Sequence, residues 1–292
     1  MPRRVVYTAL FGDHEALVEQ PAARESEIPF LCFSDNPTLE SQSWKVIHTS
    51  PLFAADPRRS QRDIKIRGHA ELAEFDEWLY IDNTVLLHSS PEQILDEWLN
   101  EADWAAFGHD VHGSTWEEFE SNLAANKDTE ERIHEQLQDY SAHHAAALDN
   151  PPLWNGFFAR SNNEAVREFA ALWFDHVCRY SARDQLSVMV ALEGTPVTVN
   201  VIRGSARKSQ WHSWPHRTGE SKTGKAARHA KTTGLKPLAE ELLTVREALA
   251  ASEKEIERLQ DAKWCGLGGL VRRLRENRRH RRRVKRGDLR GR

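Results

Sequence analysis

The feature that most constrains the fold is an alternation of apolar, β-rich runs with helical segments over the first two hundred residues. In one clear unit, the strand-like run 78–81 is followed by Asp82, and Ser90-Pro91-Glu92-Gln93 then starts a helix with a capping serine and a first-turn proline. Strands separated by helices predict an α/β sheet that gathers its ligands at the carboxyl ends of the strands. The expected strands are residues 5–11, 30–34, 44–48, 78–81, 85–88, 154–160 and 195–202.

Apolar residues at helical spacing predict helices over residues 62–75, 90–99, 163–177 and 183–192. The acidic segment 115–148 is also helical in composition. It is either a surface excursion that covers one edge of a binding site or a solvated helix pair.

The chain is expected to contain four parts. Residues 1–205 form the α/β domain, and residues 206–236, which lack apolar periodicity, form a closing loop and a linker. Residues 237–263 have apolar side chains four and three apart, which predicts a short coiled-coil helix that pairs in a homodimer or folds back on its own domain. Residues 264–292 form a basic amphipathic tail.

The net charge of −4 hides a strong asymmetry. Residues 272–292 hold twelve Lys and Arg against two acidic residues, whereas the first 271 residues hold 28 basic and 42 acidic ones. The tail lacks interleaved aromatic residues and the body is acidic, so nucleic acid is an unlikely partner. An amphipathic stretch ahead of the arginines favours contact with an anionic membrane surface, and a disordered solubilising tail is the alternative.

The expected location is cytoplasmic, with peripheral attachment to the inner face of the plasma membrane through the tail. Three widely spaced cysteines, Cys32, Cys178 and Cys265, support neither a disulfide framework nor a zinc site. The sequence shows no signal peptide and no apolar stretch of about 20 residues.

Charged residues cluster around the strand 78–81. Asp82 at its end is either a turn residue or a carboxylate that holds a divalent cation against a diphosphate. Arg58, Arg62 and Lys65 lie near one face of a helix, where they either bind phosphates or form a solvated basic face. The polar turns after the first two strands, at Gly12 and Asp35, are places for a base and a ribose.

Six motifs in succession carry a family resemblance. They are Val-Tyr-Thr-Ala-Leu-Phe-Gly-Asp, Phe-Leu-Cys-Phe-Ser-Asp-Asn-Pro, Trp-Lys-Val-Ile, Arg-Asp-Ile-Lys-Ile-Arg-Gly-His, Trp-Leu-Tyr-Ile-Asp-Asn and Arg-Asp-Gln-Leu-Ser. Over about residues 4–205 the succession resembles the glycosyltransferase-like family, once classed as a domain of unknown function, that includes plant Golgi mucilage and pectin proteins and bacterial members. The resemblance implies a GT-A-type fold, with a Rossmann-like mixed sheet that binds a nucleotide-sugar and usually a divalent metal, Mn²⁺ or Mg²⁺.

The resemblance implies that Asp82 stands at the metal and diphosphate motif, that Arg58, Arg62 and Lys65 form the basic segment before it, and that Arg183, Asp184 and Gln185 lie near the reacting sugar and the acceptor. Further candidates for the donor side are Thr8, Phe11, Gly12, Asp35 and Asn83. Asn155 and Gly156 resemble the acceptor side of sugar transferases, and a tight turn before a core strand is the equal alternative. His109 with Asp110 is a candidate for the base on the acceptor side. Asp184 is preferred over His109 as the reacting carboxylate, although a helix-capping role explains it equally well.

The metal site departs from the usual Asp-x-Asp pattern, because Thr84 stands where the second carboxylate would be. His212 is the candidate that completes the metal shell, and an exposed loop histidine is the alternative. The expected function is transfer of a sugar, with a UDP-linked donor as the first candidate, to a glycan or glycolipid acceptor in surface polysaccharide synthesis. The alternative is a non-catalytic scaffold that keeps the nucleotide-sugar fold and binds partners through its coiled coil and tail.

Overall fold

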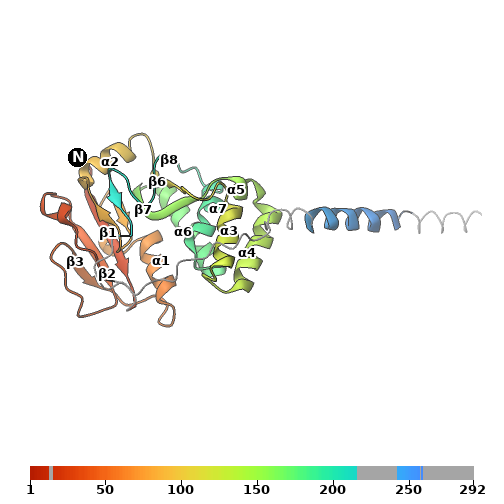
Figure 1. Ribbon diagram of the computed structural model, residues 1–292, viewed down its shortest axis with the longest axis horizontal. Helices are drawn as coiled ribbons and strands as arrows, with labels where there is room; N and C mark the ends of the chain where they lie inside the picture. Colours follow the sequence, from red (N-terminus) through yellow and green to blue (C-terminus); the bar gives the residue numbers. More distant parts are fainter. Residues whose placement is uncertain (13–15, 216–241, 257, 259–292) are drawn as a thin grey trace, which may run out of the picture. The chain divides into compact units, whose positions relative to one another are not determined.

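The computed structural model describes residues 1–12, 16–215, 242–256 and 258, and the chain divides into two units, Met1–Lys236 and Pro237–Arg292. The first unit contains a seven-stranded sheet in the order β3-β2-β1-β4-β7-β6-β8 and a two-stranded sheet of β5 and β9. The predicted α/β class, a mixed sheet flanked by helices, is confirmed (Figure 1). The strands are β1 (Arg4–Leu10), β2 (Phe30–Ser34), β3 (Lys45–His48), β4 (Glu77–Ile81), β5 (Leu86–Leu87), β6 (Trp104–Gly108), β7 (Leu153–Ser161), β8 (Val199–Ile202) and β9 (His212–Ser213).

All strands of the large sheet run parallel to their neighbours except β7, which is antiparallel to both β4 and β6. The central strands are buried on both faces, which explains their continuous apolar runs. The α-helices are α1 (Pro57–Arg67), α2 (Pro91–Trp98), α3 (Thr115–Ala124), α4 (Glu130–His143), α5 (Ala145–Asp149), α6 (Glu164–Arg179) and α7 (Val188–Glu193). Three short 3-10 helices are η1 (Pro21–Arg24), η2 (Ala70–Leu72) and η3 (Asp184–Leu186).

The two faces of the sheet pack against different helices. On one face, side chains such as Tyr7 and Tyr80 join a core with α1, α6 and α7. On the other face, side chains such as Val6 and Ile81 pack against α2 and the segment around Trp211. The alternation of β-strand side chains sends neighbouring residues to opposite cores.

The first predicted helix is displaced. Its expected range was 62–75, but α1 begins at Pro57, where the Asp56 side chain accepts the Arg59 backbone N–H at 2.9 Å. The helix ends at Arg67 because Gly68 adopts φ +87°, a backbone conformation that glycine adopts readily and other residues rarely adopt. The remaining residues of the expected helix form η2 and the turn before β4.

The C-terminal part of the domain also differs from the expectation. The expected helix 183–192 is interrupted into η3 and α7, because the indole N–H of Trp173 holds the Asp184 carbonyl at 2.9 Å. The expected strand 195–202 is shortened to β8, since the Thr195 N–H still donates to the Leu192 carbonyl at the end of α7, at 3.2 Å. Residues 206–215, expected as a loop, contribute β9 and the buried Trp211, so the described domain core continues beyond residue 205.

In the second unit, residues 242–256 are helical, in agreement with the predicted helix 237–263 as far as it is described. Its apolar residues Leu242, Val245, Leu249 and Ile256 are exposed in the single chain, and their pairing stays a prediction. The tail 264–292 lies outside the described residues. Among the described helices, none combines the length and the hydropathy that a membrane span requires.

We predict that Gly68→Ala lowers the free energy of unfolding by roughly 2–4 kcal/mol, because the added Cβ demands an unfavourable φ and overpacks a filled site. That Cβ would collide with Cζ3 of Trp78 and lie 2.8 Å from its Cη2. Urea unfolding at constant slope measures the change.

The matched control is Gly113→Ala. A Cβ there meets nothing closer than the Glu117 Oε1 at 3.7 Å. Its midpoint should stay near that of the wild type, and an equal loss in both variants would contradict the explanation from Gly68.

Candidate active site

The reversed direction of β7 creates the site. The ends of β1, β4 and β6 lie at the same edge of the sheet as the beginning of β7, since antiparallel pairing sets Ile81 opposite Phe157 and Gly108 opposite Leu153. The backbone N–H of Asp82 donates to the Gly156 carbonyl at 2.8 Å. Two segments separated by more than seventy residues therefore meet beyond the strand ends.

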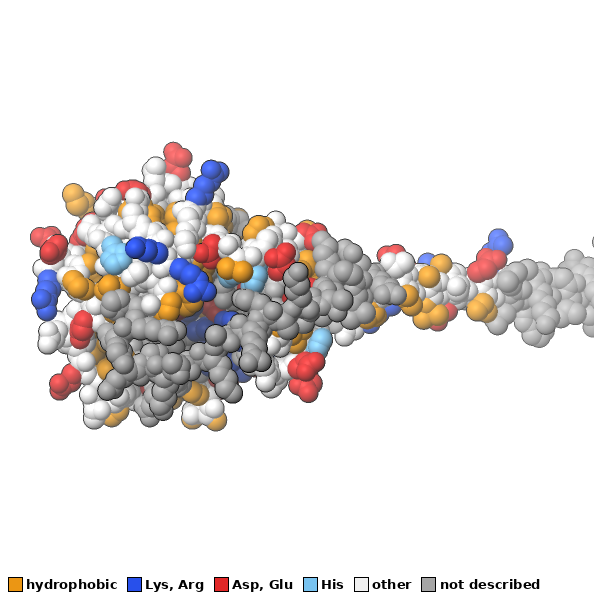
Figure 2. All heavy atoms as spheres, viewed as in Figure 1, with side chains coloured by type: hydrophobic (Ala, Val, Ile, Leu, Met, Phe, Trp, Pro, Cys, Tyr) orange, Lys and Arg blue, Asp and Glu red, His pale blue; other side chains and the backbone are white. Residues whose placement is uncertain are grey.

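A cavity of about 460 Å³ opens at this edge, within the size range of small-molecule sites. Residues 1–215 contain 18 Lys and Arg against 34 Asp and Glu, yet the cavity is lined by six cationic side chains and four carboxylates. Figure 2 shows that acidic side chains (red) are spread over the visible face of the body, among basic ones (blue). The lining includes Phe11, Arg58, Arg62, Lys65, Asp82, Asn83, His109, Asp110, Asn155, Gly156, Arg183, Asp184 and Gln185, all predicted site residues.

Asp82 presents one carboxylate oxygen toward the cavity. Its Oδ1 accepts the Tyr80 hydroxyl at 2.7 Å and lies 3.6 Å from the Lys65 Nζ. Its Oδ2 borders Gly156, where an added Cβ would stand 3.1 Å away and only 2.5 Å from the Trp154 ring. Glycine is therefore required at 156, and the side chain of Asp82 keeps 28% of its surface exposed.

Asp184 lies beneath the cavity in a buried ion cluster. Its Oδ2 is 2.7 Å from the Lys65 Nζ and its Oδ1 is 3.0 Å from the Arg62 Nε. Both Lys65 and Asp184 are only 2% exposed. Burial opposes ionisation of Asp184, but the two cations prevail and lower its pKa well below the ordinary value.

This cluster corrects two expectations. Asp184 was the preferred reacting carboxylate, but a buried carboxylate with both oxygens held by cations is a poor proton acceptor. Lys65 was expected on phosphates, but its ammonium already faces Asp184 and Asp82. Both residues instead support the floor of the cavity.

The remaining cations are better placed for an anionic ligand. Arg183 is held by the Asn122 Oδ1 at 3.1 Å, and burial and the neighbouring Arg62 lower its pKa. Arg58 is exposed, and its guanidinium donates to the Lys127 carbonyl at 2.9 Å. A bound anion stabilises an arginine whose pKa is lowered by burial and by neighbouring cations, so this side of the cavity suits a diphosphate.

The donor set fits a hard divalent cation only sparsely. Asn155 is 1% exposed, and neither its side-chain oxygen nor its nitrogen has a hydrogen-bond partner among the described residues. A buried amide without a partner costs stability unless a ligand completes it. The oxygen of Asn155 is therefore a candidate second ligand in the cavity lining beside Asp82, while Thr84 Oγ1 accepts the Trp214 indole N–H at 3.1 Å.

Four predicted residues are not brought to the cavity as the structure describes it. Thr8 is fully buried in β1, and the Asp35 Oδ1 accepts the Gly12 backbone N–H at 3.0 Å in a contact between two turns. His212 is buried against Trp154, with its Nδ1 2.9 Å from the Ser209 hydroxyl and its Nε2 2.8 Å from the Ala206 carbonyl. Both ring nitrogens are thus engaged, so His212 does not face the cavity as a metal ligand.

Sequence reasoning missed several lining residues. His112 and Glu118 join His109 in a compact group, and Trp154 and Trp214 add aromatic surface with ring centroids 5.2 Å apart. The spacing of His109 and His112 was a usable signal. Nothing in the pattern of the acidic helix α3 distinguished Glu118 from its exposed neighbours.

We predict that Asp184→Asn lowers the free energy of unfolding by about 3 kcal/mol or more at pH 7, because Lys65 and Arg62 lose their buried counter-ion. Since the pKa of Asp184 is depressed in the folded state, its contribution is present above its ordinary pKa of 3.8 and is lost as the pH falls below that value. The difference from the wild type should therefore persist at pH 5 and shrink in stronger acid, as measured by urea unfolding.

The control is Glu135→Gln, which breaks the exposed ion pair with Arg179 at 2.7 Å and should leave the midpoint nearly unchanged. A difference for Asp184→Asn that grows on acidification would contradict the sign of the pKa shift.

Comparisons with known proteins come from sequence and from structure. The bifunctional glycosyltransferase WbbM is similar to this chain with a TM-score of 0.39 and 12% sequence identity. The match covers 69% of this chain and 39% of WbbM. Core-mannan synthase A from Aspergillus fumigatus, in its Mn/GDP form, matches with 10% sequence identity and a TM-score of 0.35, and the match covers 66% of this chain and 70% of that one. The mannosyltransferase Ktr4p of S. cerevisiae matches with 7% sequence identity and a TM-score of 0.37, and the match covers 65% of each chain. A search of curated proteins returns no match.

All three TM-scores are below 0.5, so the assignment depends on the sequence profile. Residues 2–216 match the family described as TOD1/MUCI70, glycosyltransferase-like domain. This match covers more than two thirds of the chain and ends where the described core of the domain ends. The chain therefore belongs to the TOD1/MUCI70 glycosyltransferase-like family.

Proposed function

We propose that the protein transfers a sugar from a nucleotide-sugar, with a UDP-linked donor as the first candidate, to a hydroxyl of a glycan or glycolipid in surface polysaccharide synthesis. One observation carries the proposal most: a net cationic cavity lies at the strand ends of an otherwise acidic domain and contains an open Asp82 oxygen. Membership of a glycosyltransferase-like family supports the same reaction class.

The donor diphosphate is proposed to lie between Asp82 and the arginines. Asp82 and Asn155 would hold a divalent cation, Mn²⁺ or Mg²⁺, whose chemistry is to neutralise charge on a departing diphosphate. Arg58, Arg62 and Arg183 stabilise the same charge through hydrogen bonds from fixed positions. The ion cluster around Asp184 keeps Arg62 in place.

The aromatic surface is proposed to hold the flat parts of the ligands. Trp154 and Trp214 line the cavity beside Gly156, where the backbone comes close to the open space. Indole faces bind bases by stacking and bury the apolar faces of sugars. Gln185 and Asp110, which also line the cavity, supply polar groups for hydroxyls.

The test is a thermal-shift and turnover panel of nucleoside diphosphates and nucleotide-sugars, with and without Mn²⁺. A ligand at about 100 times its Kd should stabilise the native state by about 2.7 kcal/mol. In Asp82→Asn, the metal-dependent part of the shift should vanish, because the cation loses its carboxylate ligand. Donor turnover should fall by about 10²–10³-fold, because charge on the departing diphosphate is less well stabilised.

Asp96→Asn is the matched control, since Asp96 is an exposed carboxylate of α2 that pairs with Arg4 outside the cavity. It should behave as the wild type. A folded wild-type protein that no nucleotide stabilises would favour the scaffold function instead.

We further propose that the tail attaches the protein to the inner face of the plasma membrane. The support is its sequence alone: an amphipathic stretch precedes twelve Lys and Arg within residues 272–292. Each basic residue near an anionic surface contributes about 1 kcal/mol at moderate salt.

Deletion of residues 264–292 should release the protein from vesicles that contain phosphatidylserine, measured by co-sedimentation. Raising the salt concentration should weaken binding of the full chain in the same assay, because screening reduces the attraction. Unchanged binding after the deletion would contradict the attachment.

A further inference from the structure

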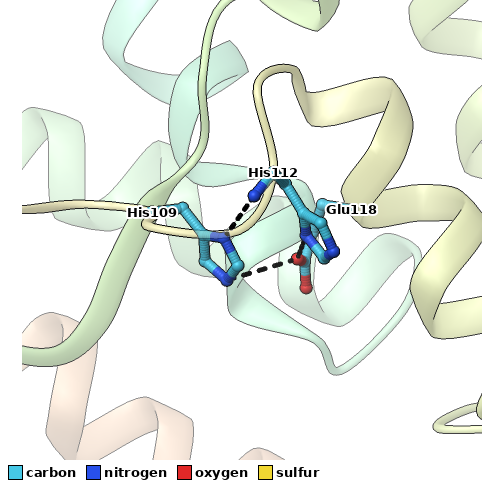
Figure 3. A group of neighbouring side chains, drawn as sticks. All are labelled: His109, His112 and Glu118. Atoms are coloured by element: carbon cyan, nitrogen blue, oxygen red, sulfur yellow. Dashed lines mark hydrogen bonds and ion pairs between the residues drawn. The ribbon is translucent and has the colours of Figure 1, made fainter. Parts of the chain in front are cut away.

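A histidine and a buried glutamate form a tight pair at the wall of the cavity (Figure 3). The Nδ1 of His112, in the loop after β6, lies 2.6 Å from the Oε2 of Glu118 on α3. Glu118 is 2% exposed, and its other oxygen accepts the Asn122 amide at 2.7 Å. Both residues line the cavity.

His109 completes the group but is held differently. Its Nδ1 accepts the backbone N–H groups of His112 at 3.0 Å and of Val111 at 3.3 Å. An accepting Nδ1 leaves the proton of a neutral ring on Nε2, which lies 3.8 Å from the Glu118 Oε2. The two imidazole rings stack with centroids 4.5 Å apart.

Two functions suit such a group, namely a metal site and a proton-transfer pair. The candidate ligand atoms lie within 4.8 Å of one another, which suits a metal ion. However, a metal-bound histidine normally donates its second N–H to an acceptor, whereas the Nδ1 of His109 faces two donors. The 2.6 Å separation between His112 and Glu118 is also a charge-assisted hydrogen bond. The contacts therefore favour proton transfer.

We propose that His112, oriented by Glu118, is the general base that accepts the proton of the acceptor hydroxyl; this inference rests on the proposed transferase function. Glu118 accepts the Nδ1–H of His112 and so leaves the lone pair on Nε2. The hydroxyl proton moves to Nε2 while the acceptor oxygen bonds to the anomeric carbon. The bond from that carbon to the diphosphate oxygen breaks, and its electron pair leaves with the diphosphate.

The surrounding charges support this role. The Glu118 carboxylate stabilises the imidazolium that forms on His112. Burial opposes ionisation of Glu118, but the hydrogen bond from His112 and the neighbouring histidines lower the pKa of Glu118. Burial lowers the pKa of the stacked His109, which keeps that ring neutral beside a protonated His112. The base thus moves from His109, the candidate from sequence, to its neighbour.

The first test compares donor turnover in the full chain. With the donor that the panel identifies, His112→Gln should lower kcat by about 10²–10⁴-fold and leave the nucleotide thermal shift unchanged. Glu118→Gln should lower kcat at least tenfold, because an amide no longer holds the reactive tautomer. His134→Gln, which removes an exposed histidine paired with Glu130 on α4, should match the wild type.

The second test does not depend on turnover. Nitrogen-15 NMR of the histidine rings should show that His112 of the wild type is protonated on Nδ1. In Glu118→Gln, the tautomer population of His112 should shift away from this form. The measurement does not need His112→Gln, so it still tests the proposal if that variant does not fold. A wild-type His112 protonated on Nε2 would overturn the assignment. So would tight binding of one Zn²⁺ that both His109→Gln and His112→Gln abolish.

The two proposals fail in different ways. A wild-type protein that neither binds nor turns over any nucleotide-sugar overturns the proposed function and the base together. Wild-type turnover that His112→Gln retains overturns the base alone.

Discussion

A buried ion pair between Lys65 and Asp184, 2.7 Å apart, holds together the floor of the cavity. It joins α1 to η3, and through the 3.6 Å contact of Lys65 with Asp82 it extends to the end of β4. Arg62 completes the cluster from the same face of α1. An ion pair this deeply buried is costly to form and more costly to break, so the three elements keep one arrangement around the open oxygen of Asp82.

The cluster also divides the charges of the site into two groups. Carboxylates such as Asp184 neutralise the buried cations, while Arg58 and Arg183 keep donors for an anion at the cavity wall. A cationic cavity in an acidic body concentrates the field where a diphosphate would lie. The domain around the cavity is acidic, so the cationic cavity is the part of it that attracts an anion.

A second part of the cavity wall is built from α3 and the loop after β6. Glu118 extends from the acidic helical segment into the cavity and engages His112, while Asn122 of the same helix turn contacts both Glu118 and Arg183. One helix therefore positions both the proposed proton-transfer group and an arginine of the proposed phosphate site. The acidic segment 115–148 covers one edge of the site, as one of its two sequence interpretations held.

The α/β class, most strands and the family could be predicted from the sequence, because apolar periodicity and consecutive motifs are local properties. The sequence also identified the basic residues of α1 and Asp82 as candidates, because the basic residues precede the strand β4 in the sequence and Asp82 directly follows it. The structure was needed to show that Asp184 is a buried counter-ion, that His212 is engaged in the core and that Glu118 reaches His112. The contact of Asp184 with Lys65 joins segments far apart in the sequence, whereas the contacts of Glu118 and His212 are close in sequence but depend on how the loops after β6 and before β9 fold. Burial of these side chains then sets their charge and availability, which no local pattern records.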